Sequence, residues 1–379
     1  MKFSLIEKLK RSSNIDWILF FATIPLLGAG LVTMDSFVGE NYFFEKQVVW
    51  IAVSLLVFFG LSFFDFRFLK RTNILVALFV LSIFLLLGLL GLTHAIKGAK
   101  SWLDFGAFSF QPSDPIKILV ILILAKYFSR RHIEIAHIRH IIVSGIYAFI
   151  PFVLVFLQPD FGSAIIIAFI WLGMVLVSGI SKKHLLAVFL LGAISFGGLW
   201  IFAFEDYQKQ RIMTFVNPLT DIQGAGYNAY QSTIAVGSGE LFGKGVGYGT
   251  QSRLRFLPEY QTDFIFAAFA EEWGFIGVIL LFVMFGIVIW RILANAMLGA
   301  TNFEIFFGMG VAVFFMAQFI VHVGMNIGLM PVTGLPLPFV SYGGSHLITE
   351  FTALGILMGM RRYNKAAHKD DTRYEFLGA

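Results

Sequence analysis

The chain has no cysteine and few charged residues. None of its 379 residues is Cys and 13% are charged, whereas about a quarter are charged in ordinary soluble domains. The absence of Cys excludes disulfides, thiol catalysis and thiolate metal sites. The low charge, together with a hydrophobic content of 58%, excludes a soluble globular protein. The composition predicts a polytopic membrane protein.

Ten apolar segments are long enough, or nearly long enough, to cross a bilayer. They cover residues 17–33, 48–64, 74–92, 115–128, 141–157, 163–177, 185–204, 264–290, 306–324 and 346–360. No small-residue cleavage site follows the first, which favours a retained helix over a signal peptide. The segments 115–128 and 346–360 are short, so each is expected to be tilted, extended at its ends or partly inserted. The predicted fold is one all-α polytopic membrane domain over residues 1–379.

Lysine and arginine gather in one alternating set of the connections between these segments. That set contains Arg67, Lys70, Arg71, Lys126, Arg130, Arg131, Arg139, Lys182, Lys183, Arg291, Arg361, Arg362, Lys365 and Lys369. The positive-inside rule makes this side cytoplasmic and places both termini there, including the tail 361–379. The rule also accounts for the net charge of +5 without a nucleic-acid partner. His132, His137 and His140 fit a solvated basic loop better than a metal cluster.

A long outer loop, about residues 205–262, falls between the seventh and eighth segments. It is rich in glycine, but no strand precedes it and no Gly-Lys-Ser/Thr sequence ends it, so it is neither a dinucleotide fingerprint nor a Walker loop. Loops of this length are usually functional, and cations such as Arg211 and Lys244 can balance an anionic ligand. A cysteine introduced at Ser232 is expected to react with an impermeant reagent from outside.

Asp263 lies where this loop meets the next apolar segment. A carboxylate at the mouth of a membrane span is costly unless it faces protein, water or a substrate, so Asp263 is a candidate functional residue. The alternative is a helix N-cap, made by Asp263 or by the neighbouring Thr262. The last outer loop, residues 325–345, is rich in Pro and Gly. Irregular backbone at membrane depth requires protein or a water-filled cavity, so this loop is expected to fold back over the same cavity.

An earlier outer segment, residues 97–117, carries further charges. Lys97 and Lys100 precede an amphipathic Trp102, and Asp114 and Lys117 stand at the mouth of the next span. A pair three residues apart shares one face of a helix. The pair is either an ordinary ion pair or part of a cationic clamp for a phosphate group.

The helix expected after Asp263 has one face of small residues. Ala267, Ala270 and Gly274 follow at helical spacing, which allows close approach of another helix or of an acyl chain. Glu271 and Glu272 lie two turns deeper and need partners, and a structural bond is at least as good an explanation as catalysis.

Several motifs resemble those of the SEDS family of cell-wall polymerases, in order and over nearly the whole chain. They are FQPSD (110–114), QPDFGSA (158–164), GAGY and IAVGSG (224–239), GKGVGYGTQ (243–251), LPEYQTDFIFAAFAEEWG (257–274) and PLPFVSYGGS (336–345). The GKG and GTQ patterns look more like the rod-shape branch, RodA, than like the division branch, FtsW. A sporulation branch stays an alternative.

The resemblance implies a peptidoglycan glycosyltransferase of the bacterial cytoplasmic membrane. Such an enzyme polymerises lipid II at the outer face and works with a class B penicillin-binding protein as transpeptidase. Asp263 matches the essential acidic residue of the family, and Lys117 also matches. Many members have Glu, Arg and His where this chain has Asp114, Ser101 and Gln261, which leaves the roles of residues 101 and 114 open.

The expected chemistry follows from these matches and from the outward charges. Asp263 would act as general base on the acceptor sugar hydroxyl. Lys117 and Arg211 would stabilise the leaving diphosphate, with Lys97 and Lys100 as weaker candidates. Further substrate contacts are expected at Trp102, Asp160, Glu259 and Ser341, with Asp114, Glu271 and Glu272 as supporting residues. The outer side has no clear ligand cluster, so no metal or cofactor is assigned, and a divalent cation stays an alternative.

Two other classes of function fit part of the pattern. A flippase for a lipid-linked substrate would explain the spans and the cavity. A secondary transporter would explain Glu271, Glu272 and Glu350 within apolar segments. Neither requires a long outer loop that ends on one carboxylate, and the cytoplasmic loops look like plain determinants of topology.

Overall fold

The computed structural model describes residues 15–36, 42–92, 101–104, 106, 109–130, 138–202, 204–217, 226–254 and 256–374. Each of the ten predicted apolar segments overlaps one helix. These helices are α2 (Trp17–Asp35), α3 (Tyr42–Ser62), α4 (Thr72–Leu92), α5 (Ser113–Ser129), α6 (Ile138–Phe156), α7 (Phe161–Val177), α8 (Lys182–Phe202), α12 (Ile265–Ala296), α13 (Asn302–Asn326) and α14 (Gly344–Tyr374). The shorter elements are η1 (Phe66–Lys70), β1 (Leu103–Asp104), β2 (Ser109–Phe110), α9 (Asp206–Val216), α10 (Tyr227–Ser238) and α11 (Thr250–Arg253).

In the described part of the chain, seven helices are long and apolar enough to cross a membrane, namely α2, α3, α4, α6, α8, α12 and α13. The apolar helix α7 has 17 residues, and α5 also has 17. Helix α14 is long, but its first turns carry the buried polar residues His346, Thr349 and Glu350. The protein is therefore a multi-pass membrane protein, and crossing by α5, α7 and α14 stays a prediction.

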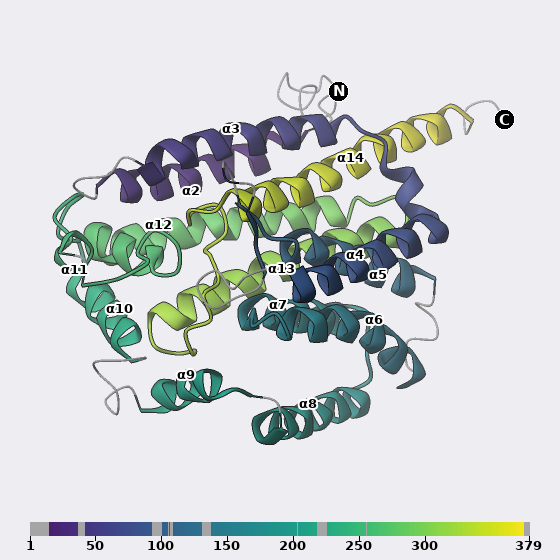
Figure 1. The fold of residues 1–379 in the computed structure, drawn as a ribbon. Coiled ribbons are helices and arrows are strands. Elements are labelled where there is room, and N and C mark those ends of the chain that lie inside the picture. The colour runs from purple at the N-terminus through teal and green to yellow at the C-terminus, as the bar shows by residue number, and fades with distance from the viewer. Residues whose placement is uncertain are drawn as a thin grey trace.

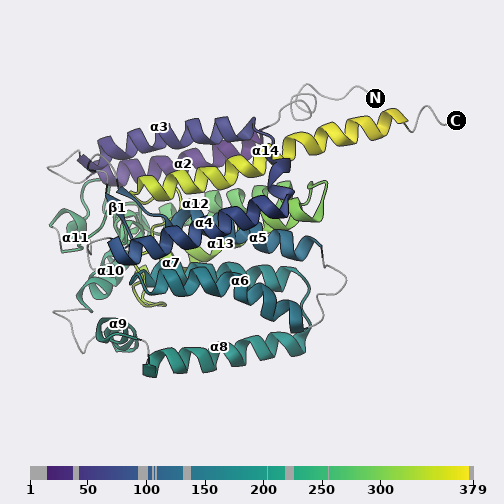
Figure 2. The same cartoon turned by 45° about the vertical axis from the view of Figure 1, so that its right-hand side comes forward.

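The helices pack in an order that differs from their order in the chain. Helix α14 packs against α3 and α12 packs against α2, while α13 packs against α5, α7 and α12. Figure 1 shows α2, α3 and α14 side by side along one edge, with α12 and α13 behind them. Helix α8 lies at the opposite edge in both views (Figures 1 and 2). Its large apolar side chains are exposed, as Ile194 at 71% and Phe202 at 87% illustrate, and this suits contact with lipid.

Several residues of the predicted cytoplasmic set meet at one end of the bundle. Asp16 caps α2 by accepting bonds from the N–H groups of Ile18 and Leu19. Its other carboxylate oxygen accepts from Arg291 Nε at 3.0 Å and lies 3.3 Å from Arg361. Burial alone would raise the pKa of Asp16. The hydrogen bonds from Arg291 and Asn295 and the positive charges of Arg291 and Arg361 outweigh this effect, so the pKa lies below its usual value. Figure 1 shows α10 and α11 at the other end of the molecule, away from the end of α14.

Candidate active site

Asp263 stands in a tight turn just before α12. The carbonyl of Glu259, whose φ is 51°, accepts bonds from the N–H groups of Thr262 and Asp263 at 3.1 Å and of Phe264 at 3.3 Å. Helix α12 has Phe264 as its N-cap, with no side-chain capping bond. The Thr262 hydroxyl instead donates to the Glu259 carbonyl at 3.3 Å. The N-cap position of α12 is therefore Phe264, which follows Asp263 in the chain.

The backbone on both sides of the Asp263 carboxylate is fixed by other segments. Asn326 Nδ2, at the end of α13, donates to the Asp263 carbonyl at 3.0 Å. Ser341 Oγ donates to the Thr262 carbonyl at 2.7 Å. Gly334 has a φ of +73°, and a Cβ there would lie 3.5 Å from Asp263 Oδ2. These bonds fix the backbone on both sides of Asp263, whose side chain lies at a half-buried site.

Lys117 and Asp114 form a buried ion pair on α5. Their side chains are 1% and 3% exposed, and Lys117 Nζ lies 2.9 Å from Asp114 Oδ1. His346 Nδ1 on α14 lies 3.8 Å from the same oxygen, and His346 Nε2 lies 2.7 Å from Glu350 Oε1. The N–H of Phe339 donates to Glu350 Oε2 at 3.0 Å. His346 is not among the residues predicted from the sequence, although its spacing of four from Glu350 on a helix was an available signal.

Asp160 links α5 to α7. It is the N-cap of α7 and accepts a bond from the N–H of Ser163 at 3.0 Å. Its second oxygen accepts from Gln111 Nε2 at 2.7 Å and from Ser113 Oγ at 3.1 Å. These bonds make Asp160 a structural residue in this state, and its contact with substrate stays a prediction.

The loop between α13 and α14, residues 327–343, joins these groups. Ser341 holds the Asp263 turn and Phe339 holds Glu350. The neighbouring Ser345 accepts a bond from the N–H of Gln111 at 3.1 Å. The expectation that the last outer loop folds back toward Asp263 thus agrees with its contacts. The loop and the start of α14 therefore contact the turn that carries Glu259 and Asp263. They also lead through Glu350 and His346 to Asp114 and Lys117, and through Gln111 to Asp160.

Helix α12 is broken at Gly274, and the glycine-rich loop fills the break. Gly274 has φ 66° and ψ −169° inside the helix. The carbonyls of Glu271 and Glu272 accept bonds from the N–H groups of Lys244 and Gly245, both at 3.0 Å, and the Phe275 N–H donates to the Glu240 carbonyl at 2.9 Å. The loop backbone therefore satisfies the groups that the break releases, as buried irregular backbone in a membrane protein requires.

The two glutamates of α12 are bound by the same region. Glu271 Oε1 accepts from Lys244 Nζ at 2.7 Å and from the N–H of Thr250 at 2.8 Å. Glu272 Oε1 accepts from Ser36 Oγ at 2.7 Å. Both carboxylates are supporting groups in this geometry. Lys244, proposed from the sequence to balance a ligand, is instead paired with Glu271.

The small face of α12 was expected to allow close approach of another helix or of an acyl chain, and the structure shows a helix there. Ala267 packs with Ala235 of α10, and a Cβ at Gly239 would lie 2.0 Å from the Ala270 carbonyl oxygen. The choice of Ser232 as a position for labelling was wrong. Ser232 is fully buried and donates to the Asn326 carbonyl at 2.9 Å. It is therefore unsuitable as a labelling position.

Some predicted site residues are only partly described or not described. Lys97 and Lys100 lie outside the described residues, and Arg211 is on α9 with its side chain outside the description. Trp102 is half-buried just before β1. Among the described residues, no group of three or more His, Asp or Glu could hold a metal ion. Use of a divalent cation by the protein stays an untested alternative.

Fold and site together define a class, an integral membrane protein with a positioned carboxylate and a buried ion pair at one end of its helices. The chain belongs to the family described as the FtsW, RodA and SpoVE cell cycle proteins, whose model matches residues 14–366.

Curated relatives agree with this assignment. The chain is 39% identical over 292 residues to the peptidoglycan glycosyltransferase MrdB of Escherichia coli strain K12, covering 77% of this chain and 79% of the relative. It is 33% identical over 370 residues to the stage V sporulation protein E of Bacillus subtilis strain 168, covering 94% and 99%.

Solved structures are also similar. A chain in a peptidoglycan synthase complex, described as coordinating polymerization and crosslinking, has a TM-score of 0.79 and 29% identity, covering 92% of this chain and 98% of that one. The rod shape determining protein RodA of Thermus thermophilus has a TM-score of 0.69 and 29% identity, covering 92% and 96%.

Proposed function

We propose that this chain is a peptidoglycan glycosyltransferase that polymerises lipid II, with Asp263 as its general base. The observation that carries the proposal is the Asp263 turn. Its backbone is fixed by Glu259, Asn326 and Ser341, and this turn holds Asp263 just before α12. A carboxylate fixed at the mouth of a membrane helix suits proton transfer.

In the proposed reaction, Asp263 takes the proton of the acceptor sugar hydroxyl. That oxygen forms a bond to the anomeric carbon of the donor sugar with inversion, and the bond from this carbon to polyprenyl diphosphate breaks. The diphosphate leaves with the electron pair, and positive side chains lower the barrier by stabilising that charge. Lys117 and Arg211 are the proposed cations, with Lys97 and Lys100 as weaker ones.

The role of Lys117 needs a rearrangement or an indirect effect, because Asp114 already neutralises it at 2.9 Å. The pair is connected through His346, Glu350 and Phe339 to the loop that holds Asp263. Lys117 therefore serves either as a cation released by the diphosphate or as a positioning group for the loop. Trp102, Asp160, Glu259 and Ser341 remain proposed substrate contacts.

Several wider features belong to the same proposal. The ten helices form one membrane domain with both termini in the cytoplasm, and the segment 205–262 lies outside. The partner is a class B penicillin-binding protein, in line with the crosslinking named for the similar synthase complex. The similarity to MrdB and to RodA supports a role in elongation and rod shape, whereas the similarity to the sporulation protein keeps that role as the alternative.

Polymerisation can be distinguished from transport by an assay in detergent solution, where no membrane separates two compartments. Purified protein is incubated with lipid II in detergent, and the products are resolved on a gel for glycan strands. Strands from the wild-type chain support a polymerase, since a flippase or a transporter makes no product there. The transport alternative has also lost support, because Glu271 and Glu272 are bound by Lys244 and Ser36.

Asp263→Asn is the decisive variant in this assay. It keeps the size of the side chain and the backbone bonds of the turn, but an amide does not accept a proton at neutral pH. We expect a loss of about 10²- to 10⁴-fold in glycan synthesis, the usual range for a general base, with an unchanged thermal midpoint. Glu240→Gln is the matched control, because it removes a carboxylate from the exposed outer loop. Near-normal synthesis by Asp263→Asn would refute the assignment.

A further inference from the structure

A second polar feature lies far from Asp263, between α4, α5 and α6. A cavity of about 400 Å³ is lined by Thr72, Leu75, Val76, Phe79, Ile123, Lys126, Tyr127, Arg130, Arg139, Val143 and Tyr147. Lys126 donates to the Lys70 carbonyl, and Lys70 pairs with Glu304 at the start of α13. Asp263 is bound at the other end of α13, by Asn326. At 1.5 Å per residue the two ends are about 33 Å apart, so this cavity is not part of the candidate active site.

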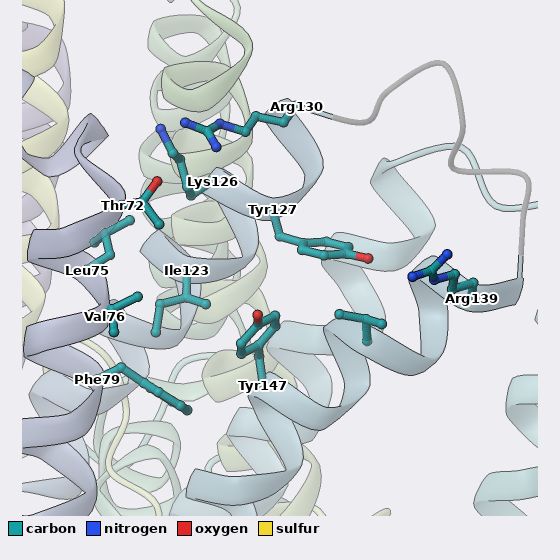
Figure 3. A pocket seen from close by; sticks show the side chains of 11 residues that line it. Thr72, Leu75, Val76, Phe79, Ile123, Lys126, Tyr127, Arg130, Arg139 and Tyr147 are labelled. Atoms are coloured by element: carbon teal, nitrogen blue, oxygen red, sulfur yellow. The ribbon is translucent and has the colours of Figure 1, made fainter.

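The rim of the cavity is positively charged. Lys126, Arg130 and Arg139 all line it, and all belong to the predicted cytoplasmic set. Figure 3 shows Lys126 and Arg130 at the upper rim and Arg139 across from them. Within the described ranges, the ion pairs found do not provide a carboxylate for any of the three, and the nearby Glu304 is taken by Lys70 at 2.6 Å. The cavity therefore presents an excess of positive charge to a ligand.

Below the rim the walls are apolar. Figure 3 shows Val76, Phe79 and Tyr147 below the cations. Val76 is 54% exposed and Tyr147 is 37% exposed, although both flank the cavity. On helices that cross a membrane, such surface faces acyl chains, so an acyl chain can reach this wall of the cavity. A free phosphate ion would use only the rim and gain nothing from these walls.

We propose that this cavity binds an anionic phospholipid of the leaflet on that side. The phosphate would lie among Lys126, Arg130 and Arg139, and the first part of an acyl chain would lie along Val76, Phe79 and Tyr147. Basic pockets between helices on the cytoplasmic side recognise such head groups, and the cavity volume lies within the usual range for ligand sites. A bound lipid would join α4, α5 and α6, so the stability of this end depends on lipid charge.

The test uses the purified full-length chain in a neutral detergent. Dioleoyl phosphatidylglycerol, dioleoyl phosphatidylcholine and inorganic phosphate are titrated separately, and the thermal midpoint and the retained lipid, by native mass spectrometry, are measured. We expect only phosphatidylglycerol to raise the midpoint and to remain bound. Arg130→Gln/Arg139→Gln should weaken this binding about 25-fold, which is about fivefold for each cation near an anionic surface.

The matched control is Arg67→Gln/Lys183→Gln, which removes two cations from the same predicted side, away from the cavity. It should keep the preference for phosphatidylglycerol. Val143→Trp fills the cavity without changing the charge and should also weaken binding. Equal effects of the two lipids, a shift produced by inorganic phosphate alone, or an unchanged preference in both cavity variants would each overturn the proposal.

Discussion

At the scale of single residues, the pair of Lys117 and Asp114 has the clearest energetic consequence. Both side chains are almost fully buried. Removal of one partner from a buried pair leaves an uncompensated charge and typically costs about 3–5 kcal/mol, whereas replacement of both by uncharged residues is often neutral. A loss of activity in Lys117→Ala alone would therefore not distinguish a structural pair from a functional cation.

Comparison of a single variant with a double variant separates the structural role of the pair from a catalytic role of Lys117. Lys117→Met should lower the thermal midpoint and abolish glycan synthesis. Lys117→Met/Asp114→Asn should recover most of the midpoint, because no carboxylate remains unpaired. If Lys117 acts on the diphosphate, the double variant stays inactive despite its recovered stability. Recovery of both stability and synthesis would assign the pair to structure alone.

At the scale of elements, the break in α12 depends on a glycine in a conformation that side chains avoid. A Cβ at Gly274 would lie 2.2 Å from the Gly243 nitrogen, and the φ of 66° is itself unfavourable for other residues. We expect Gly274→Ala to destabilise the protein by at least about 1–3 kcal/mol from backbone strain, with a further cost from the contact. The measurement is the thermal midpoint in detergent.

The same helix offers a control for this substitution. A methyl group added at Gly286 would meet no atom within 4 Å, and this glycine lies in the regular part of α12. Gly286→Ala should be neutral or stabilising by about 0.5–1 kcal/mol, since Ala is the better helix former. Equal midpoints for the two variants would mean that the loop does not fix the break.

The sequence predicted where helices occur better than where they end. Helix α3 begins at Tyr42, earlier than expected, because Glu45 and Lys46 interrupted the apolar run without interrupting the helix. Helix α14 continues to Tyr374 through polar residues that favour a helix but not a membrane. Hydropathy measures solvent preference, whereas helix ends depend on local backbone bonds.

The candidate site was predicted only in part, because the sequence reports local properties more directly than contacts between distant segments. The sequence located Asp263 because a carboxylate beside an apolar run is unusual, and it located Asp114 with Lys117 because their spacing is local. The contacts of His346 with Asp114 and of Asn326 with Asp263 join distant segments. Such contacts depend on how the helices pack, and helix packing cannot be deduced from the spacing of residues along the chain.

At the scale of the whole molecule, orientation in the membrane is the main property to test. The native chain has no Cys, so single cysteines give a clean background. Tyr248, in the loop predicted to lie outside, is 68% exposed, and Met297, between α12 and α13, is 64% exposed. Tyr248→Cys should react with a membrane-impermeant thiol reagent in cells with an intact cytoplasmic membrane. Met297→Cys, matched in exposure, should react only after lysis, and the reverse pattern would invert the proposed topology.

The packing of early helices against late ones has a consequence for biosynthesis. Asp16 is bonded to Arg291 and approaches Arg361, and Gln47 of α3 donates to the Ser341 carbonyl at 3.1 Å. During translation, Asp16 is made 275 residues before Arg291 and Gln47 is made 294 residues before Ser341. Until α12 and α14 are inserted, the polar groups of α2 and α3 need other hydrogen-bond partners, either water at the membrane surface or an insertion factor. A ribosome that stops before residue 344 therefore releases a chain in which α2 can pack against α12 but α3 lacks α14, the helix against which it packs.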